Sequence, residues 1–199
     1  PESLLDECSS LSLNILNSIF LFLVTTTSMP TIIKHTLYYC WCLTILILHK
    51  NDFLIIDELA FSGLSNLIDL DLHNNALSYL SNTTFTQLSK LQNLDLSYTL
   101  ISCVSEHLFV NNSNLTHLDL SHSLLSRLSF MSSVRLESLS VLLLSHTLIA
   151  LHSFADVNIR WRLPSLTRIH VVQAELCCLF PRAECVSDIT PPDGIGSCR

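Results

Sequence analysis

A block of 24 residues recurs along most of the chain, and this repeat constrains the fold more than any other feature of the sequence. Its signature, L-x-x-L-x-L-x-x-N-x-F/L, covers residues 43–53 in the first copy and residues 67–77 in the second. Three further copies begin at Leu91, Leu115 and Leu139, and a sixth begins at Leu166 after a slightly longer interval. Because fixed repeats of this length are typical of solenoids, we expect each copy to form one turn that packs on its neighbours.

The paired leucines of each copy alternate with the period of a β-strand, so both should face the interior. Copies stacked side by side would form a parallel sheet with strands about 4.8 Å apart. The sequence therefore predicts an α/β fold. We expect a leucine-rich repeat solenoid with a curved parallel sheet on its concave face and a disulfide-rich cap at its C-terminal end.

Three regions follow from this pattern: an irregular N-terminal segment (1–42), the repeats (43–176) and a cysteine-rich cap or hinge (177–199). Residues 9–33 of the first region contain no charged side chain. A signal or anchor segment, a membrane-spanning helix and an aberrant insert between two repeats all remain open there. The chain starts with Pro1 and ends just after a cysteine, so we expect it to be a fragment or the product of a poorly bounded gene model.

Two internal ladders should support the stacked turns. The asparagine of the signature, whose amide would bond backbone groups of adjacent turns, is present as Asn51 and Asn75. Later copies replace it with Thr99, Ser123, Thr147 and Ala174, so the ladder should loosen toward the C-terminus. A phenylalanine spine should run along the far side, with a change of register at Phe130 and Phe154. Its regular members are Phe61, Phe85 and Phe109.

Charge and cysteine content limit the class of partner and the compartment. Ten Lys and Arg against 17 Asp and Glu give a net charge of -7, which disfavours nucleic acid and favours cationic partners. Four cysteines at the C-terminus predict two disulfides in an oxidising compartment, with three possible pairings; they are Cys177, Cys178, Cys185 and Cys198. Glycosylation sequons begin at Asn82, Asn111 and Asn114, outside the predicted strands.

The candidate ligand-binding surface is the side of the strands that faces away from the leucines. The residues predicted to line it are Asp69, Asp71, His73, Asn93, Asp95, Ser97, His117, Asp119 and Ser121. We name as ligand-binding candidates Asp69, Asp71, Asp95, Asp119 and His117. The carboxylates 71, 95 and 119 should form a column between apolar shelves at residues 45–47 and 141–143, with Arg168 and His170 closing the surface. Such a strip suits arginine-bearing ligands. Aspartate at this position of a repeat more often serves only solubility and local hydrogen bonding.

Other residues carry weaker signals. His122 and His146 should stack on consecutive turns, where solvated surface histidines are a more common outcome than a metal or pH-sensing site. Cys103 is expected to be a small buried residue. No catalytic motif or phosphate-binding glycine loop is present, so we predict neither an enzyme nor a cofactor or metal.

The tail carries a more specific resemblance. Residues 163–171, followed by Leu176-Cys177-Cys178, Cys185 and Gly-Ser-Cys198, are similar to the hinge of leucine-rich repeat-containing G-protein-coupled receptors, closest to the relaxin receptor-like branch. That resemblance implies an ectodomain at the extracellular side of the plasma membrane that binds a peptide or glycoprotein hormone. In relaxin receptors acidic concave side chains hold hormone arginines, and Asp71, Asp95 and Asp119 match those positions. Coupling to a G protein would require a seven-helix domain that this sequence lacks.

The leading expectation is thus the ligand-binding ectodomain of a hormone-type receptor, for a peptide or protein hormone carrying basic residues. The alternatives are a secreted or surface recognition or adhesion protein of the innate immune or matrix type, and a functionless structural fragment.

Overall fold

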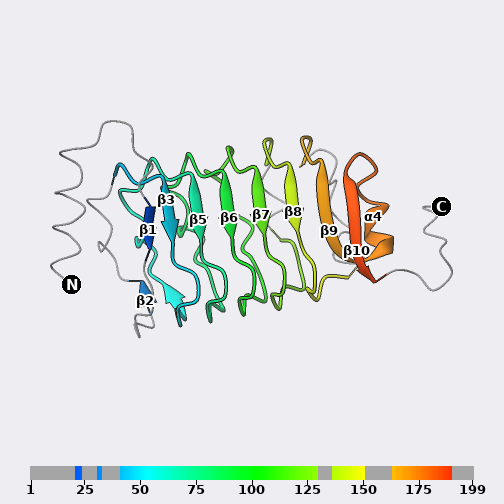
Figure 1. Ribbon diagram of the computed structural model, residues 1–199, viewed down its shortest axis with the longest axis horizontal. Coiled ribbons are helices and arrows are strands. Elements are labelled where there is room, and N and C mark those ends of the chain that lie inside the picture. Colours follow the sequence, from blue (N-terminus) through cyan, green and yellow to red (C-terminus); the bar gives the residue numbers. More distant parts are fainter. Residues whose placement is uncertain (1–20, 24–30, 33–40, 130–135, 151–162, 190–199) are drawn as a thin grey trace.

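Parallel strands stacked side by side dominate the computed structural model, which describes residues 21–23, 31–32, 41–129, 136–150 and 163–189 (Figure 1). Within these ranges eight strands form one sheet in the order β1-β3-β5-β6-β7-β8-β9-β10. Their bounds are β1 Leu21–Leu23, β3 Ile45–Ile47, β5 Asp69–Asp71, β6 Asn93–Asp95, β7 His117–Asp119, β8 Val141–Leu143, β9 Arg168–Gln173 and β10 Glu184–Ile189. A smaller sheet pairs β2 (Thr31–Ile32) with β4 (Ile55–Ile56).

The register of the main sheet matches the repeat residue for residue. Leu46 pairs with Leu70, Leu70 with Leu94 and Leu94 with Leu118, each step spanning 24 positions. These central leucines are 0 to 2% exposed, whereas the residues on either side of each are half-buried or exposed. The predicted α/β leucine-rich repeat solenoid is therefore confirmed, and burial of one leucine row fixes which strand face remains open.

The phenylalanine spine lies on the side of the core away from the sheet. Phe61, Phe85 and Phe109 are at most 1% exposed, and successive ring centroids are 6.1 Å apart with near-parallel planes. Each ring thus stacks on the ring of the next turn, which adds an aromatic contact to the burial of its apolar surface. The predicted change of register at Phe130 and Phe154 lies outside the described residues.

The hydrogen bonds made at the signature asparagine position differ between the first repeats, which keep asparagine, and the later repeats, which carry threonine or serine there. Asn75 donates to the carbonyl of Leu72 in its own turn at 2.8 Å and to that of Leu48 in the preceding turn at 3.0 Å. Thr99, like Ser123 and Thr147, donates its hydroxyl to the carbonyl three residues earlier. A hydroxyl carries one hydrogen, so that bond leaves none to donate to a neighbouring turn.

The N-terminal segment contributes strands at the same spacing as the repeats. Leu21 in β1 pairs with Ile45 in β3, and Thr31 in β2 pairs with Ile55 in β4, both 24 residues on. The leucine signature is recognisable only from Leu43 onward, because this segment carries Ile19, Phe22 and Val24 where later copies carry leucine. No helix in the described ranges is both long and apolar enough to cross a membrane.

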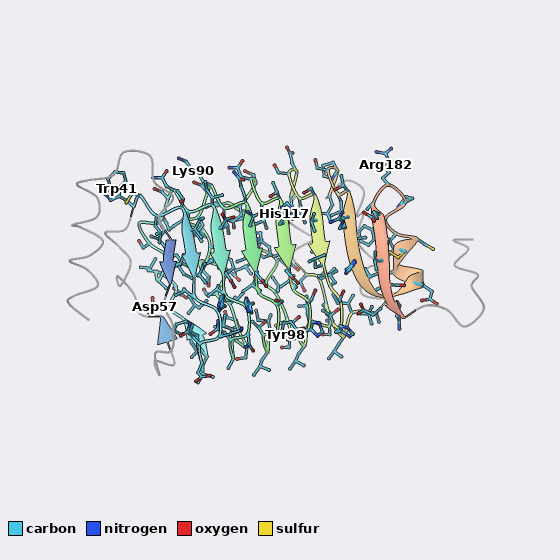
Figure 2. The ribbon with its side chains drawn as sticks, viewed as in Figure 1. Trp41, Asp57, Lys90, Tyr98, His117 and Arg182 are labelled. Atoms are coloured by element: carbon cyan, nitrogen blue, oxygen red, sulfur yellow. A yellow bond between two sulfur atoms is a disulfide. The ribbon has the colours of Figure 1, made fainter. Side chains whose placement is uncertain are left out.

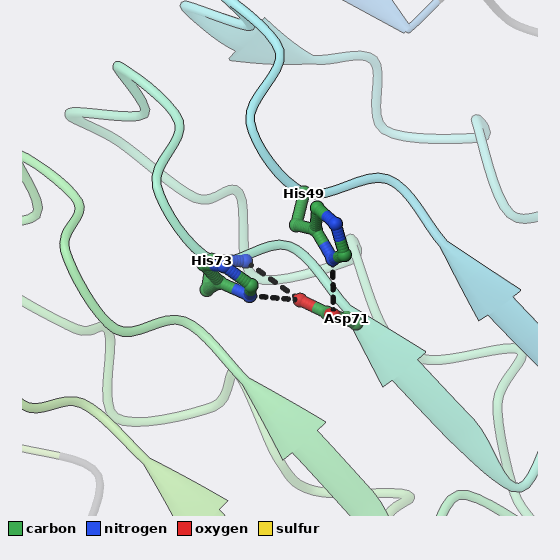
Figure 3. A group of neighbouring side chains, drawn as sticks. All are labelled: His49, Asp71 and His73. Atoms are coloured by element: carbon green, nitrogen blue, oxygen red, sulfur yellow. Dashed lines mark hydrogen bonds and ion pairs between the residues drawn. The ribbon is translucent and has the colours of Figure 1, made fainter. Parts of the chain in front are cut away.

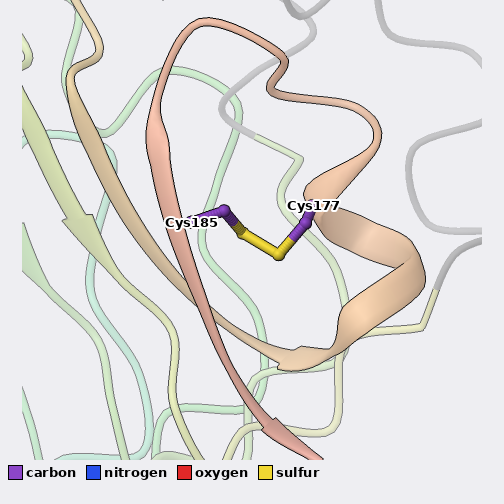
Figure 4. Close-up of a disulfide and its surroundings, with 2 residues drawn as sticks. All are labelled: Cys177 and Cys185. Atoms are coloured by element: carbon purple, nitrogen blue, oxygen red, sulfur yellow. A yellow bond between two sulfur atoms is a disulfide. The ribbon is translucent and has the colours of Figure 1, made fainter. Parts of the chain in front are cut away.

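The C-terminal cap continues the sheet. After β9, the short helix α4 (Ala174–Cys177) leads to β10, which pairs with β9 in parallel, and a disulfide joins Cys177 to Cys185 across this turn (Figure 4). Cys178 is also disulfide-bonded. Cys198, the fourth cysteine predicted to form a disulfide, lies outside the described residues.

One cysteine differs from expectation. Cys103 was predicted to be buried, but it is exposed and carries a free thiol. The prediction was wrong because Val104, the next residue, occupies the inward position of this convex stretch at 2% exposure.

Candidate functional site

A shallow depression on the concave face collects all the predicted ligand-binding residues. It has a volume of about 220 Å³ and extends across strands β3 to β8. Asp69 and Asp71 from β5, Asp95 from β6, and His117 and Asp119 from β7 all line it, and Figure 2 shows His117 on the open side of the sheet. The strands bring these residues together because every second side chain of each strand faces this side.

The three aspartates stack in register as the sequence predicts. Asp71 pairs with Asp95 across β5 and β6, and Asp95 pairs with Asp119 across β6 and β7. One carboxylate oxygen of each accepts the backbone N–H two residues later, at 3.0, 2.8 and 2.8 Å respectively. We call these three residues the aspartate column. The local hydrogen-bonding role considered for them therefore exists, and it uses one oxygen of each side chain.

Asp71 is engaged by two histidines (Figure 3). The Nδ1 atom of His49 lies 2.7 Å from Asp71 Oδ2, and that of His73 lies 2.8 Å from Oδ1. Partial burial raises the pKa of Asp71, but hydrogen bonds from His49 and His73 outweigh it and hold the pKa below its ordinary value. Asp71 is thus already partnered within the chain, which leaves Asp95 and Asp119 as the column's better candidates for an external cation.

Sequence reasoning missed His49, although a signal was present. His49 and His73 follow their strands at matching positions 24 residues apart, and their rings lie 4.4 Å apart between centroids. The alternation that places Ile45 and Ile47 on the concave face places residue 49 there next. In the first repeat the concave positions were followed only to Ile47, the last paired residue of its strand, so His49 was not recognised as the neighbour of His73.

Asp69 and His117 lie two residues before Asp71 and Asp119 on the same strands. Asp69 accepts a hydrogen bond from the side-chain amide of Asn93 on the neighbouring strand. His117 is exposed, and its Nδ1 atom lies 2.9 Å from the hydroxyl of Thr116. Of these two, His117 presents more accessible surface to a ligand.

The pKa of Asp119 is shifted in the opposite direction to that of Asp71. Burial raises its pKa above the ordinary value of 3.8 and the negative charge of Asp95 adds to this, despite hydrogen bonds from Ser121 that act in the other direction. Half-buried Ile45 and Ile47 flank one side of the aspartate column, while Val141 and Leu143 flank the other. The site therefore combines two neighbouring carboxyl side chains with apolar surface on both sides.

Replacing Asp119 with asparagine should stabilise the fold slightly at neutral pH. A folded-state pKa above the unfolded-state value means that ionised Asp119 disfavours folding at any pH above that folded-state pKa. Asparagine keeps an oxygen for the Ser121 N–H and removes the charge. Urea midpoints of the wild type and Asp119→Asn should differ at about pH 7 and approach each other at about pH 3, where Asp119 is mostly protonated in both the folded and the unfolded state. A wild type that is more stable than the variant at neutral pH would contradict this assignment.

Two flanking features complete the surface. Tyr98, His122 and His146, all in left-handed backbone conformation, stack their rings with centroids 4.1 and 4.3 Å apart, so the predicted histidine stack exists. Arg168, expected to close the concave face, lies 3.3 Å from Glu184 in an exposed ion pair. The guanidinium is therefore balanced by a partner on β10.

The sequon asparagines lie at the surface. Asn82, Asn111 and Asn114 are exposed and stand outside the strands. Asn111 and Asn114 each donate from the side-chain amide to a backbone carbonyl of the preceding turn, at 3.1 and 2.8 Å. Their positions are compatible with attached glycans, and glycosylation stays a prediction.

Comparison with known proteins identifies one family and two similar solved structures. The leucine rich repeat family model matches residues 42–101 and 89–149, which together exceed half of the chain. The crystal structure of TLR13 in complex with ssRNA13 is similar at 27% identity and a TM-score of 0.60, covering 77% of this chain and 22% of that chain. The leucine-rich repeat protein LIC12759 of Leptospira interrogans aligns at 17% identity and a TM-score of 0.61, covering 76% and 38%. No curated protein sequence matches significantly.

Proposed function

The chain belongs to the leucine-rich repeat family, and from that premise we propose that its concave face binds a peptide or protein ligand carrying arginine or lysine. Members of this family are generally binding modules and not enzymes. The observation that carries the proposal is the registered pair Asp95 and Asp119, held between apolar strand residues in one depression.

The chemistry of that pair favours a guanidinium. Each carboxylate uses one oxygen for a backbone N–H, and Asp119 has a raised pKa because it is partly buried beside Asp95. A bound cation between them would relieve the repulsion and form charge-assisted hydrogen bonds. Apolar side chains on the ligand would then cover Ile45, Ile47, Val141 and Leu143.

We place this binding surface in the ectodomain of a hormone-type receptor at the extracellular side of the plasma membrane. The Cys177–Cys185 disulfide and the exposed sequon asparagines support an oxidising, extracellular location. The similarity of the tail to the hinge of relaxin receptor-like proteins supports a hormone as the ligand. The chain spans 22% of the TLR13 chain and 38% of the Leptospira chain, so the activity of any longer protein is part of this proposal.

The affinity test uses a defined probe. A fluorescein-labelled helical peptide with arginines four residues apart and leucines between them should bind the wild type, as measured by fluorescence anisotropy. The Asp95→Asn/Asp119→Asn double variant should bind about tenfold more weakly or worse, and with a flatter dependence on salt. A peptide in which citrulline replaces arginine separates charge from shape.

Two results would remove the acidic-surface proposal. One is equal affinity and equal salt slope for the wild type and the double variant. The other is equal binding of the arginine and citrulline peptides. Since asparagine at 119 should leave the fold intact or slightly more stable, loss of binding cannot be assigned to unfolding if the urea midpoint of the double variant is no lower than that of the wild type.

A second candidate function is pattern recognition of the innate immune or matrix type. It is favoured by the similarity to TLR13, a protein whose crystal structure contains single-stranded RNA. The aspartate column and net charge of -7 would repel a phosphate backbone, so for this chain we favour a protein over RNA as partner. Transcript sequence beyond Arg199 separates the candidates: seven apolar segments of about 20 residues favour the receptor, and a single anchor helix or a stop codon favours its rival.

A further inference from the structure

His49, Asp71 and His73 form a cluster at the start of the concave face, and the proposed ligand binding does not use this cluster. Imidazole nitrogens of His49 and His73 and a carboxylate oxygen of Asp71 all lie within 4.8 Å of one another. Two imidazoles and one carboxylate are a common donor set for zinc and related divalent metals. Figure 3 shows both rings directed at the same carboxylate.

The distances between donors are close to those of a metal site. Ligand atoms about 2.0 to 2.1 Å from a tetrahedral zinc ion lie about 3.3 Å from one another. The His49 and His73 nitrogens lie 2.7 and 2.8 Å from Asp71 oxygens, so small side-chain rotations would open the space for an ion. A fourth position would be left for water or a ligand group.

The scaffold holds these donors in place. Residues 49 and 73 follow adjacent strands, and the backbone N–H of Lys50 donates to the carbonyl of His73 at 3.0 Å, which ties the two turns together. The three side chains are between 26 and 31% exposed, so an ion could enter from solvent while the strands limit donor movement. Preorganised donors reduce the ordering cost of binding.

The local charge also favours a dication. Asp95 places a second carboxylate oxygen 3.8 Å from the His73 Nδ1 atom, close enough to act on the cluster without being one of its three donors. The negative charge of Asp95 would add to the potential that attracts a dication to the cluster. Coordination requires an unprotonated Nδ1, so the ring hydrogen of a neutral histidine would move to Nε2 on binding.

We propose that His49, Asp71 and His73 form a binding site for a divalent transition metal ion, with zinc as the best match. No metal site was predicted from the sequence, in which His49 and Asp71 are 22 residues apart and belong to no short metal-binding motif. The parallel stacking of two turns brings them together, which is visible only in the fold.

The test titrates zinc chloride into tag-free, oxidised protein by calorimetry. The background carries Cys42→Ser and Cys103→Ser, because the thiols of these cysteines, free in the described part of the chain, would compete for the ion. One zinc ion should bind per chain. His49→Gln and His73→Gln should each weaken binding by about tenfold or more, and the matched control His117→Gln, on the same face, should leave it unchanged.

A readout without any ligand substitution keeps the test decisive if a variant folds poorly. NMR spectra of the protein with Cys42→Ser and Cys103→Ser, and with all histidines intact, provide this readout. On zinc addition the ring resonances of His49 and His73 should shift, and those of the stacked rings of His122 and His146 should not. The proposal is overturned if no ion binds saturably at one per chain, if His117→Gln loses affinity as much as His49→Gln does, or if the shifts fall on the other pair.

Discussion

Replacing Phe85 with alanine should lower the free energy of unfolding by about 3 to 5 kcal/mol. Phe85 has no exposed surface, and its ring stacks between those of Phe61 and Phe109 at 6.1 Å on each side. Alanine would leave a cavity at the middle of the spine, where both neighbouring turns lose contacts. Urea unfolding followed by circular dichroism measures the change.

The matched control for that variant is Tyr79→Ala, because Tyr79 is a large aromatic residue that is 60% exposed. It should change stability by no more than about 0.5 kcal/mol. If Phe85→Ala were no more destabilising than Tyr79→Ala, the spine would not be a structural element of the core.

Replacing Asn75 with alanine should cost about 2 to 4 kcal/mol. Its side chain donates to the carbonyls of Leu72 and Leu48, and its oxygen accepts the N–H of Phe53 at 3.3 Å. Removal would leave these buried backbone groups without a partner, and it would break links between two turns at once. The same urea experiment measures the effect.

Thr99→Val provides the comparison for Asn75. Valine keeps the size of threonine and removes the one hydroxyl bond, to the carbonyl of Leu96 at 2.8 Å. That change should cost about 1 kcal/mol, because it leaves a single carbonyl within the same turn unpaired. Equal costs for the two substitutions would show that the asparagine ladder does not link neighbouring turns.

Most of the fold follows from the sequence because the repeat ties each strand to the next by a fixed spacing. The inward leucines, the phenylalanine spine and the aspartate column all appear where a 24-residue period and a two-residue strand alternation place them. These features depend on local pattern alone. They also constrain one another, since a shift by one residue would expose the whole leucine row.

The features that the sequence did not reveal depend on side-chain contacts between turns. The engagement of Asp71 by His49 and His73 needs two rings from adjacent turns to meet one carboxylate. The pairing of Arg168 with Glu184 needs the cap strand β10 to lie beside β9, although the chain between them turns through α4. The Arg168–Glu184 contact has no sequence motif. The 24-residue spacing of His49 and His73 places both rings near Asp71, but it does not specify that both bond to that carboxylate.

The concave face can be tested as the ligand surface by carboxylate footprinting with mass spectrometry. Carbodiimide and glycine ethyl ester label accessible carboxylates, and the arginine–leucine peptide would be present or absent during labelling. We predict that the bound peptide protects Asp95 and Asp119, while labelling of Asp57 and Glu58, on another side of the solenoid, does not change. Unchanged labelling of Asp95 and Asp119 at saturating peptide would contradict the account, as would equal protection of all four carboxylates.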